Sequence, residues 1–507
     1  MKPSDTHDKS GGKSGSTSVN KSLVTRMRSA ASRGAVKRAA KTRRVAGGAS
    51  REPERSRPSG RATLNIEQPR PKHCVAADDV RHATNQFREI QGEYFYSAYV
   101  DRRNASVTFV RVMALLRRQT LSDLHCHFRN ASDDIVTSPG ELYEMCENHR
   151  KLMGGWMVSC ELPEVLRDHT PCSVMVSTLP TFSQRTPPQL YVELPLFDTR
   201  SAHSASAVQS FGVCVPPLFG NITPSQLVEF VEMTRLLGAR HFVFYNHSSP
   251  RFALSSELSL ALRFYQHLGV ATTIPWRLPT SDRDVWYKGQ LLAINDCLYR
   301  TMHALRFVAF NDLDEFIVPR VGARWQHIVR EVEEYVREQT RFDRSIAQMR
   351  VVAYSFPSAF FVSDEHPPPA SQLAVHRRTR TQSDVRKKVM VRPEAIFELG
   401  IHHVSRVFDD SSAYVHNVWK EQALLHHYRA CTAQFDPAMQ CYSFVHDNTT
   451  AKYLTALRLN VDKVTSVLNE IHSLHADDVQ KYWHKQQTGA NSSFHGNASV
   501  AKTFCSW

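Results

Sequence analysis

Residues 306–319 read Arg-Phe-Val-Ala-Phe-Asn-Asp-Leu-Asp-Glu-Phe-Ile-Val-Pro, an apolar run that three carboxylates interrupt before it resumes. The β-branched and aromatic residues 308–310 are typical of a buried strand, so Asp312 and Asp314 are expected where that strand leaves the core. In open α/β sheets, ligands bind at the carboxyl ends of strands. Two aspartates one residue apart can both reach a hard divalent cation, which typically also holds substrate phosphates. The stretch therefore predicts a metal and diphosphate site.

An Asp-x-Asp pair is weak support by itself, and the chain contains a second one for comparison. Asp282 and Asp284 have the same spacing but lie in a polar segment just before a predicted helix, where helix capping is the better explanation. A solvated turn is the alternative for Asp312 and Asp314. Burying carboxylates beside a core strand without a cation is costly, which favours a ligand site there.

The region around this stretch alternates between strand and helix patterns. Thr223 and Pro224 form a helix start, and Gly238 can end that helix. Strand next to helix along the chain predicts a mostly parallel central sheet with right-handed crossovers, and hence an α/β fold. The further expected elements are a strand at 241–245, a helix through 258–268, a strand at 270–274 and a helix at 290–303.

Five ordered segments carry a family resemblance. They are Gly-Val-Cys-Val-Pro-Pro-Leu-Phe-Gly at 212–220, His-Phe-Val-Phe-Tyr-Asn at 241–246, Gly-Gln-Leu-Leu-Ala-Ile-Asn-Asp-Cys-Leu at 289–298, Asp-Leu-Asp-Glu-Phe at 312–316 and His-Tyr-Arg at 427–429. Together they resemble glycosyltransferase family 92, over about residues 211–453. The resemblance implies a GT-A-like nucleotide-sugar-binding domain, a divalent cation, usually Mn2+, and galactosyl transfer from UDP-galactose with inversion.

The metal site needs more than two aspartates. Enzymes with the GT-A fold commonly add a histidine near the end of the domain, and His402 and His427 stand in matching positions. Imidazole suits manganese-like ions beside carboxylates. A structural or surface role is the alternative for each histidine.

Basic residues downstream are candidates for contact with the substrate. Arg429 can pair with a phosphate oxygen of the nucleotide sugar, or instead form a salt bridge to a core carboxylate. Lys387, Lys388 and Arg392 form a basic strip that either contacts the substrate or is a solvated strand face.

The expected chemistry is transfer of a sugar through an oxocarbenium-like state. A cation held by Asp312 and Asp314 would act as a Lewis acid on the departing diphosphate. Inversion also requires a carboxylate base near the acceptor hydroxyl. Glu394, Asp409 and Asp410 are weak candidates for that base, and the sequence does not select among them.

The positive charge is concentrated at the N-terminus. Residues 1–72 carry 18 Lys or Arg and 5 Asp or Glu, whereas the whole chain has a formal net charge of +14, so only about +1 is left for the rest. This head has almost no aromatic residues and is expected to be disordered. A nucleic-acid or membrane patch and a transit peptide are alternatives, but with the charge confined to the head no nucleic-acid partner is expected.

Sequons and cysteines indicate the secretory pathway. Eight of the 16 asparagines begin Asn-x-Ser/Thr, where random placement would give two or three, and the ten cysteines suit a compartment in which disulfides persist. Cys431 with Cys441 and Cys160 with Cys172 are close enough for local bridges, and Cys214 with Cys297 is expected to form a bridge or a buried pair. Free buried cysteines are the alternative. The sequons begin at Asn20, Asn104, Asn130, Asn221, Asn246, Asn448, Asn491 and Asn497.

The expected organisation has four parts. Residues 1–75 form the basic head, 76–210 a stem or accessory region, 211–453 the catalytic domain and 454–507 a C-terminal extension. No stretch approaches the ~20 apolar residues that span a bilayer, so membrane association is implied by the resemblance alone.

The sequence thus predicts a metal-dependent glycosyltransferase of the Golgi or secretory pathway. Its donor is expected to be a UDP-sugar, and its acceptor a glycan or glycoprotein hydroxyl. A noncatalytic secretory carbohydrate-binding protein and a metal-dependent phosphoesterase are the rival classes.

Overall fold

The structure is a computed structural model. The expected disordered head, Asp282 and the sequons at Asn20, Asn491 and Asn497 lie outside the residues that it describes. The described residues are 85–118, 123–130, 132–167, 170–200, 209–249, 252–281, 283–339, 341–342, 349–365, 369–434 and 436–474.

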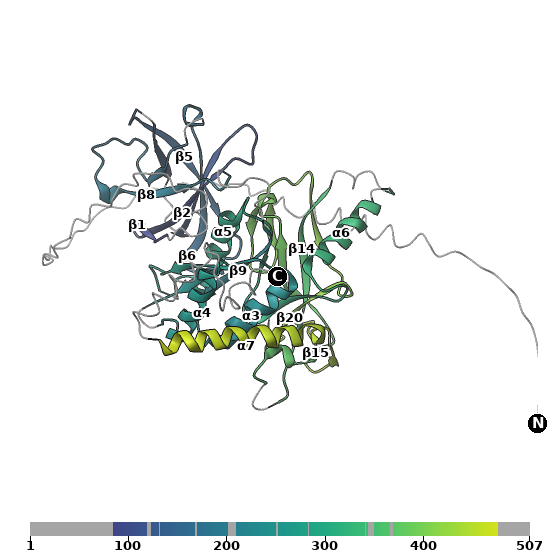
Figure 1. Cartoon of the computed structure of the whole chain (residues 1–507). Helices are drawn as coiled ribbons and strands as arrows, with labels where there is room; N and C mark the ends of the chain where they lie inside the picture. Colours follow the sequence, from purple (N-terminus) through teal and green to yellow (C-terminus); the bar gives the residue numbers. More distant parts are fainter. Residues whose placement is uncertain are drawn as a thin grey trace, which may run out of the picture. The chain divides into compact units, whose positions relative to one another are not determined.

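An eight-stranded sheet occupies the first described part of the chain (Figure 1). Its strand order is β1-β2-β3-β6-β5-β4-β7-β8, and the sheet closes on itself because β8 also pairs with β2. It lies within the range that the sequence assigned to a stem or accessory region. The strands are β1 (Arg88–Ile90), β2 (Glu93–Asp101), β3 (Phe109–Arg117), β4 (Leu124–Arg129), β5 (Ile135–Glu144), β6 (Met153–Glu161), β7 (Ser173–Ser177) and β8 (Tyr191–Phe197).

A nine-stranded sheet forms the centre of the second part, with the order β11-β10-β9-β12-β16-β14-β20-β13 and β19 beside β14. Strands β11, β10, β9 and β12 are parallel neighbours, and β16 then runs antiparallel to β12. The predicted mixed α/β class and a largely parallel sheet are confirmed. The strands are β9 (Gln209–Leu218), β10 (His241–His247), β11 (Ala271–Trp276), β12 (Leu305–Phe310), β13 (Glu315–Pro319), β14 (Arg350–Phe360), β16 (Ser383–Val391), β19 (Ala413–Asn417) and β20 (Ala423–His427).

Two small two-stranded sheets, five α-helices and five short 3-10 helices complete the described elements. Helix α5 contacts strands of both large sheets, α3 and α4 contact each other, and α7 packs on both of them. The helices are α3 (Pro224–Leu237), α4 (Ser256–His267), α5 (Gln290–Thr301), α6 (Trp325–Gln339) and α7 (Ala451–Ser473), and the small sheets pair β15 (Arg377–Thr379) with β21 (Phe444–His446) and β17 (Ile396–Leu399) with β18 (Val404–Val407).

Local sequence signals account for the helix ends near the site. Thr223 forms a capping box with Gln226 at the start of α3, and Gly238 follows the helix with a φ of 120° that favours glycine. Ser255 caps α4 by accepting from the backbone N–H of Leu258. The helices and strands expected over 223–303 are therefore confirmed to within a few residues at their ends.

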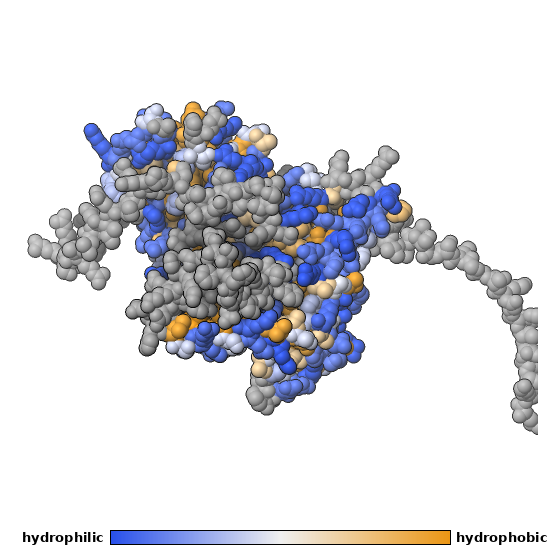
Figure 2. Space-filling model, in the orientation of Figure 1, coloured by the Kyte–Doolittle hydropathy of each residue, from blue (hydrophilic) through white to orange (hydrophobic). Residues whose placement is uncertain are grey.

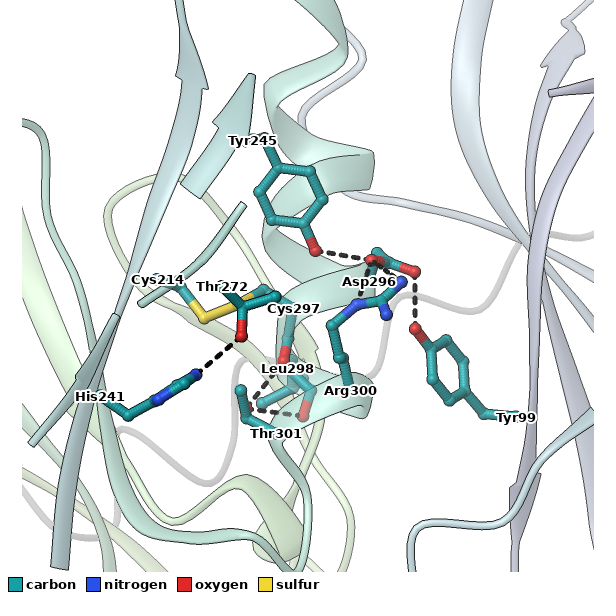
Figure 3. The surroundings of a disulfide bond; sticks show 10 residues. All are labelled: Tyr99, Cys214, His241, Tyr245, Thr272, Asp296, Cys297, Leu298, Arg300 and Thr301. Carbon is teal, nitrogen blue, oxygen red and sulfur yellow. Dashed lines mark hydrogen bonds and ion pairs between the residues drawn. A yellow bond between two sulfur atoms is a disulfide. The ribbon is translucent and has the colours of Figure 1, made fainter. Parts of the chain in front are cut away.

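A buried carboxylate ties α5 to both sheets (Figure 3). Asp296, with no exposed surface, accepts hydrogen bonds from Ser97 Oγ at 2.6 Å, Tyr99 Oη at 2.7 Å and Tyr245 Oη at 2.5 Å. The buried Arg300 guanidinium lies 3.1 Å from the same carboxylate. Because Ser97 and Tyr99 come from β2 and Tyr245 from β10, this network fastens the N-terminal sheet to the central one.

We expect Tyr99→Phe to lower the free energy of unfolding by about 1.5–3 kcal/mol, since it removes a hydrogen bond to a buried charge. Tyr96→Phe is the matched control: Tyr96 is equally buried, but its hydroxyl has no hydrogen-bond partner in the described part of the chain. Urea unfolding of both variants measures the difference. Equal losses in the two variants would contradict the importance of the Asp296 contact.

Disulfides confirm two of the three expected pairs. Cys431 bonds to Cys441, and Cys214 bonds to Cys297. The expected Cys160–Cys172 bridge is wrong, because Cys160 on β6 bonds to Cys126 on β4. The prediction was based on proximity along the chain. In the structure, the folding of β4, β5 and β6 into one closed sheet instead brings together two cysteines that are 34 residues apart in sequence.

Polar residues dominate the coloured surface on the face drawn in Figure 2, with hydrophobic residues in small scattered groups. Among the described residues, no helix is both long enough and apolar enough to cross a bilayer.

Candidate active site

Asp312 and Asp314 lie in the turn between β12 and β13, as their sequence position predicts. Because β10, β9 and β12 are parallel, their carboxyl ends share one edge of the sheet, and the aspartates follow the last of these ends. Their side chains are 40% and 35% exposed and line a cavity of about 240 Å³. Its other walls come from residues 215–219, Asn221, Ile222, Gln226, Tyr287, Leu313 and Arg429.

A buried lysine neutralises the first aspartate. Lys388 on β16 places its Nζ 3.0 Å from Asp312 Oδ2 and 3.1 Å from Glu315 Oε2. Burial by itself raises the pKa of the Asp312 carboxyl, but the charge and hydrogen bond of Lys388, with smaller contributions from His427 and His402, together lower that pKa below the usual range. Burial also opposes the charge on Lys388, yet the two carboxylates raise its pKa well above normal. Asp312 is thus held ionised by a fixed cation.

Glu315 and His427 stand behind the second aspartate. They are paired residues of the antiparallel strands β13 and β20, and His427 Nδ1 lies 3.6 Å from Glu315 Oε1. His427 Nε2 is 3.5 Å from Asp314 Oδ2. Both Nδ1 and Oε1 are buried and have no hydrogen-bond partner among the described residues. Burial raises the pKa of Glu315, with Lys388 opposing the rise.

His402 lies close enough to the pair to interact electrostatically with Lys388 and Asp312, but it does not line the cavity. Its Nδ1 is 3.0 Å from the carbonyl oxygen of Lys387. Burial, together with the charge of Lys388, lowers the pKa of His402 to about 3, so the ring is neutral. Since Nδ1 faces an acceptor, it carries the proton and the lone pair is on Nε2.

The residues at this edge are compatible with a divalent cation, although the described part of the chain contains no preformed group of three or more His, Cys, Asp or Glu arranged for a metal. Asp312 and Asp314 present carboxylates to one cavity, and the Nε2 atom of His427, a residue just outside the cavity lining, lies 3.5 Å from Asp314 Oδ2. Two carboxylates and an imidazole form a donor set that suits manganese. His402 is a second candidate imidazole, which interacts electrostatically with Asp312 but does not line the cavity.

Another part of the cavity lining is aromatic and cationic. Arg429 is exposed, lines the cavity and forms no ion pair within the described residues. Tyr287 contacts Phe219 edge to face, with ring centroids 5.0 Å apart. Arg429 was expected here from the sequence, whereas Tyr287 was not.

Backbone strain accompanies this aromatic wall. Tyr287, Lys288 and Gly289 have φ values of 44°, 60° and 73°, so three successive residues are left-handed. The Trp276 indole N–H donates to the Lys288 carbonyl at 2.8 Å and fixes the turn. Strain of this kind is commonly found at ligand sites. The sequence of this turn, Trp-Tyr-Lys-Gly at 286–289, contains only one glycine and therefore does not predict three successive left-handed residues.

The basic strip predicted from Lys387, Lys388 and Arg392 is not one surface. Lys388 is the buried partner of Asp312, whereas Lys387 pairs with the exposed Asp384. Arg392 is bound to Glu333 at 2.6 Å. Alternation along the strand sends neighbouring side chains to opposite faces.

None of the three candidate bases lines the cavity of Asp312. Glu394 pairs with Arg350 at 2.9 Å and lines a different cavity. Asp409 is exposed in a turn, where hydrogen bonds from Ser411 lower its pKa. Asp410, next to it, is also exposed.

The chain is similar to known glycosyltransferases. Residues 209–469 match the model of glycosyltransferase family 92. The chain is 27% identical over 332 residues to the beta-1,4-galactosyltransferase galt-1 of Caenorhabditis elegans, an alignment that covers 64% of this chain and 72% of that protein. It is also 23% identical over 259 residues to the galactan beta-1,4-galactosyltransferase GALS3 of Arabidopsis thaliana, covering 50% of this chain and 48% of that one.

A third relative is the glycosyltransferase family 92 protein F13G3.3 of Caenorhabditis elegans, 29% identical over 160 residues, which are 30% of this chain and 31% of that one. The fold and the family match define an enzyme of the glycosyltransferase class. The chain belongs to glycosyltransferase family 92.

Proposed function

We propose that this enzyme transfers galactose from UDP-galactose to a hydroxyl group of a glycan or glycoprotein, with inversion at the anomeric carbon. The observation that carries the proposal is the cavity in which Asp312, Asp314 and Arg429 meet at the carboxyl edge of parallel strands. The choice of galactose is supported by relatives named as beta-1,4-galactosyltransferases.

We assign the central sheet to the GT-A type of nucleotide-sugar-binding domain. The parallel strands β11, β10, β9 and β12, with an Asp-x-Asp turn after β12, support this assignment. Ligands of open α/β sheets bind at that edge.

Asp312, Asp314 and His427 would hold the divalent ion in this proposal. When bound, a manganese-type ion supplies Lewis-acid stabilisation of charge on the departing diphosphate. Lys388 keeps Asp312 ionised and fixed in position. Arg429 binds a phosphate oxygen through its guanidinium N–H groups. Tyr287 and Phe219 supply an aromatic wall against which the base can pack.

The proposal is tested by incubating the purified chain with UDP-galactose, MnCl2 and a galactose-terminated acceptor. UDP release and a product one hexose heavier are expected, with loss of turnover in chelator and recovery when Mn2+ is returned. UDP-glucose and UDP-N-acetylglucosamine serve as competing donors. No UDP release with any donor would refute the transferase proposal, and activity that is unaffected by chelator would refute the metal requirement.

We expect Arg429→Ala to raise the KM for UDP-galactose by about tenfold, because one charge-assisted hydrogen bond to the diphosphate is lost. The acceptor KM should stay unchanged. Arg458→Ala, an exposed arginine on α7, is the matched control. Initial rates at varied donor concentration measure the change, and an unaltered donor KM would contradict the role of Arg429.

We place the enzyme in the secretory pathway, at the Golgi, where UDP-sugars and glycans meet. Disulfides support passage through an oxidising compartment. Asn104 and Asn448 begin exposed sequons away from the donor cavity, whereas Asn221 lines that cavity and Asn246 lies within β10 with a buried Oδ1. Expression in animal cells should give glycans that peptide N-glycosidase removes at the exposed sequons, with none at Asn246. An unglycosylated product would contradict this location.

A further inference from the structure

A second and larger cavity lies at the other end of β12. Its volume is about 730 Å³, and it lies beside Leu305, the first residue of the strand whose far end leads to Asp312. At ~3.3 Å per residue, the length of β12 separates the two sites by roughly 20 Å. The lining residues are Arg200, His303, Leu305, Arg306, Arg350, Arg392 and Glu394.

Sheet topology explains why arginines gather here. Arg306 is near the start of β12, and Arg350 is the first residue of β14. Strand β16 runs antiparallel to both, so its end, followed by Arg392, meets their beginnings. The backbone N–H of Arg392 donates to Val352 O at 2.8 Å and locks this junction.

Only part of the positive charge is neutralised. Arg350 pairs with Glu394 at 2.9 Å, and Arg392 pairs with Glu333 at 2.6 Å. Within the described part of the chain, Arg306 and Arg200 form no ion pair with a carboxylate, although Arg200 donates to the carbonyl of Arg102. The four arginines and one glutamate that line the cavity carry a net charge of +3.

Packing fixes the position of the buried Arg392 guanidinium, whereas Arg200, Arg306 and Arg350 are exposed. The Arg392 guanidinium lies 4.3 Å from the centre of the Phe307 ring, and its Nε donates to Val351 O at 3.1 Å. Burial, followed by the charge of Arg200, lowers the pKa of His303. His303 is therefore neutral here and able to accept or donate a hydrogen bond beside the cations. The cavity therefore combines one fixed, buried cation with three exposed ones.

We propose that this cavity binds a phosphate or sulfate group. Guanidinium groups present fixed pairs of N–H donors that match the oxygens of such anions, and like charges held together without enough carboxylates are stabilised by an anionic ligand. The volume lies in the range of small-ligand sites and exceeds that of one oxyanion, so there is room for a sugar that carries the group. The site is separate from the proposed donor cavity.

Calorimetric titration of the full chain, without donor or Mn2+, tests the proposal with inorganic phosphate, inorganic sulfate and a heparin-derived tetrasaccharide. Binding is expected, and Arg306→Gln should weaken it by at least about tenfold. Arg306→Lys keeps the charge but loses the paired N–H donors, so its affinity for the ligands should lie between those of the unmodified chain and Arg306→Gln. A tetrasaccharide that binds at least tenfold more tightly than the free anions would identify a glycan as the source; equal affinities would identify the free anion.

Two further variants make the outcome decisive. Arg330→Gln, an exposed arginine on α6, should leave the affinity unchanged. Arg429→Ala removes the cation of the donor cavity and should also leave the affinity for these ligands unchanged. The proposal is overturned if none of the three ligands binds, if Arg306→Gln binds them as tightly as the unmodified chain, or if Arg429→Ala rather than Arg306→Gln abolishes binding. Since Arg306 is exposed, loss of folding is not expected to complicate its variants.

Discussion

Asp312→Asn and Asp314→Asn are each expected to lower kcat/KM for UDP-galactose by about 1,000-fold, because each removes a carboxylate charge that the proposed metal site requires. The fold should survive both changes. Asn is nearly isosteric with Asp, both side chains are partly exposed, and Lys388 keeps Glu315 as a partner when Asp312 is neutral. Steady-state kinetics with Mn2+, together with circular dichroism, measures the two effects.

Asp284→Asn is the matched control, since Asp284 belongs to the other Asp-x-Asp sequence. Its carboxylate accepts hydrogen bonds from the Thr280 and Ser281 hydroxyls, so it stabilises a turn. We expect activity within about twofold of the unmodified enzyme, as for most surface substitutions. A loss in Asp284→Asn equal to that in Asp314→Asn would mean that the site has been placed on the wrong aspartate pair.

Local patterns were sufficient to predict the elements that carry the Asp-x-Asp turn. The Thr223 cap, the Gly238 end and the apolar run of β12 are all signals within a few residues of the structure they specify. The position of Asp312 at a strand end follows from β12 alone. Because these signals are local, a single sequence is sufficient to predict these elements.

The buried roles of Lys388 and Glu315 beside the aspartates could not be predicted in this way, whereas the family resemblance had already indicated His427. Lys388 reaches Asp312 only because β16 pairs with β12 across 76 residues of chain, and His427 reaches Glu315 through β20. From the sequence alone, a lysine and a glutamate each resemble surface residues until the strand pairing is known. Strand pairing also explains two wrong predictions. The Cys160–Cys172 bridge was predicted because the pairing that places Cys160 near Cys126 was not known. Glu394 was named as a candidate base, but it lies at the Leu305 end of β12, away from Asp312.

Lys388→Met is expected to lower the free energy of unfolding by about 3–5 kcal/mol, the usual cost of removing one partner from a buried ion pair. Methionine preserves the length and the apolar stem of the side chain, so the loss reports on charge. Without the ammonium, Glu315, which is buried, and Asp312 face each other with no cation between them. Urea unfolding at neutral pH measures the loss.

Two comparisons separate this electrostatic cause from a general effect of mutation in β16. Lys387→Met alters the preceding residue, whose Nζ is 3.0 Å from the carboxylate of Asp384. Because that carboxylate is 82% exposed, the change should lower the free energy of unfolding by less than about 1 kcal/mol. Adding Glu315→Gln to Lys388→Met removes one of the two uncompensated charges and should recover part of the stability. If Lys388→Met costs no more than Lys387→Met, or if Glu315→Gln makes the double variant still less stable, Lys388 is not the cation that holds the two carboxylates together.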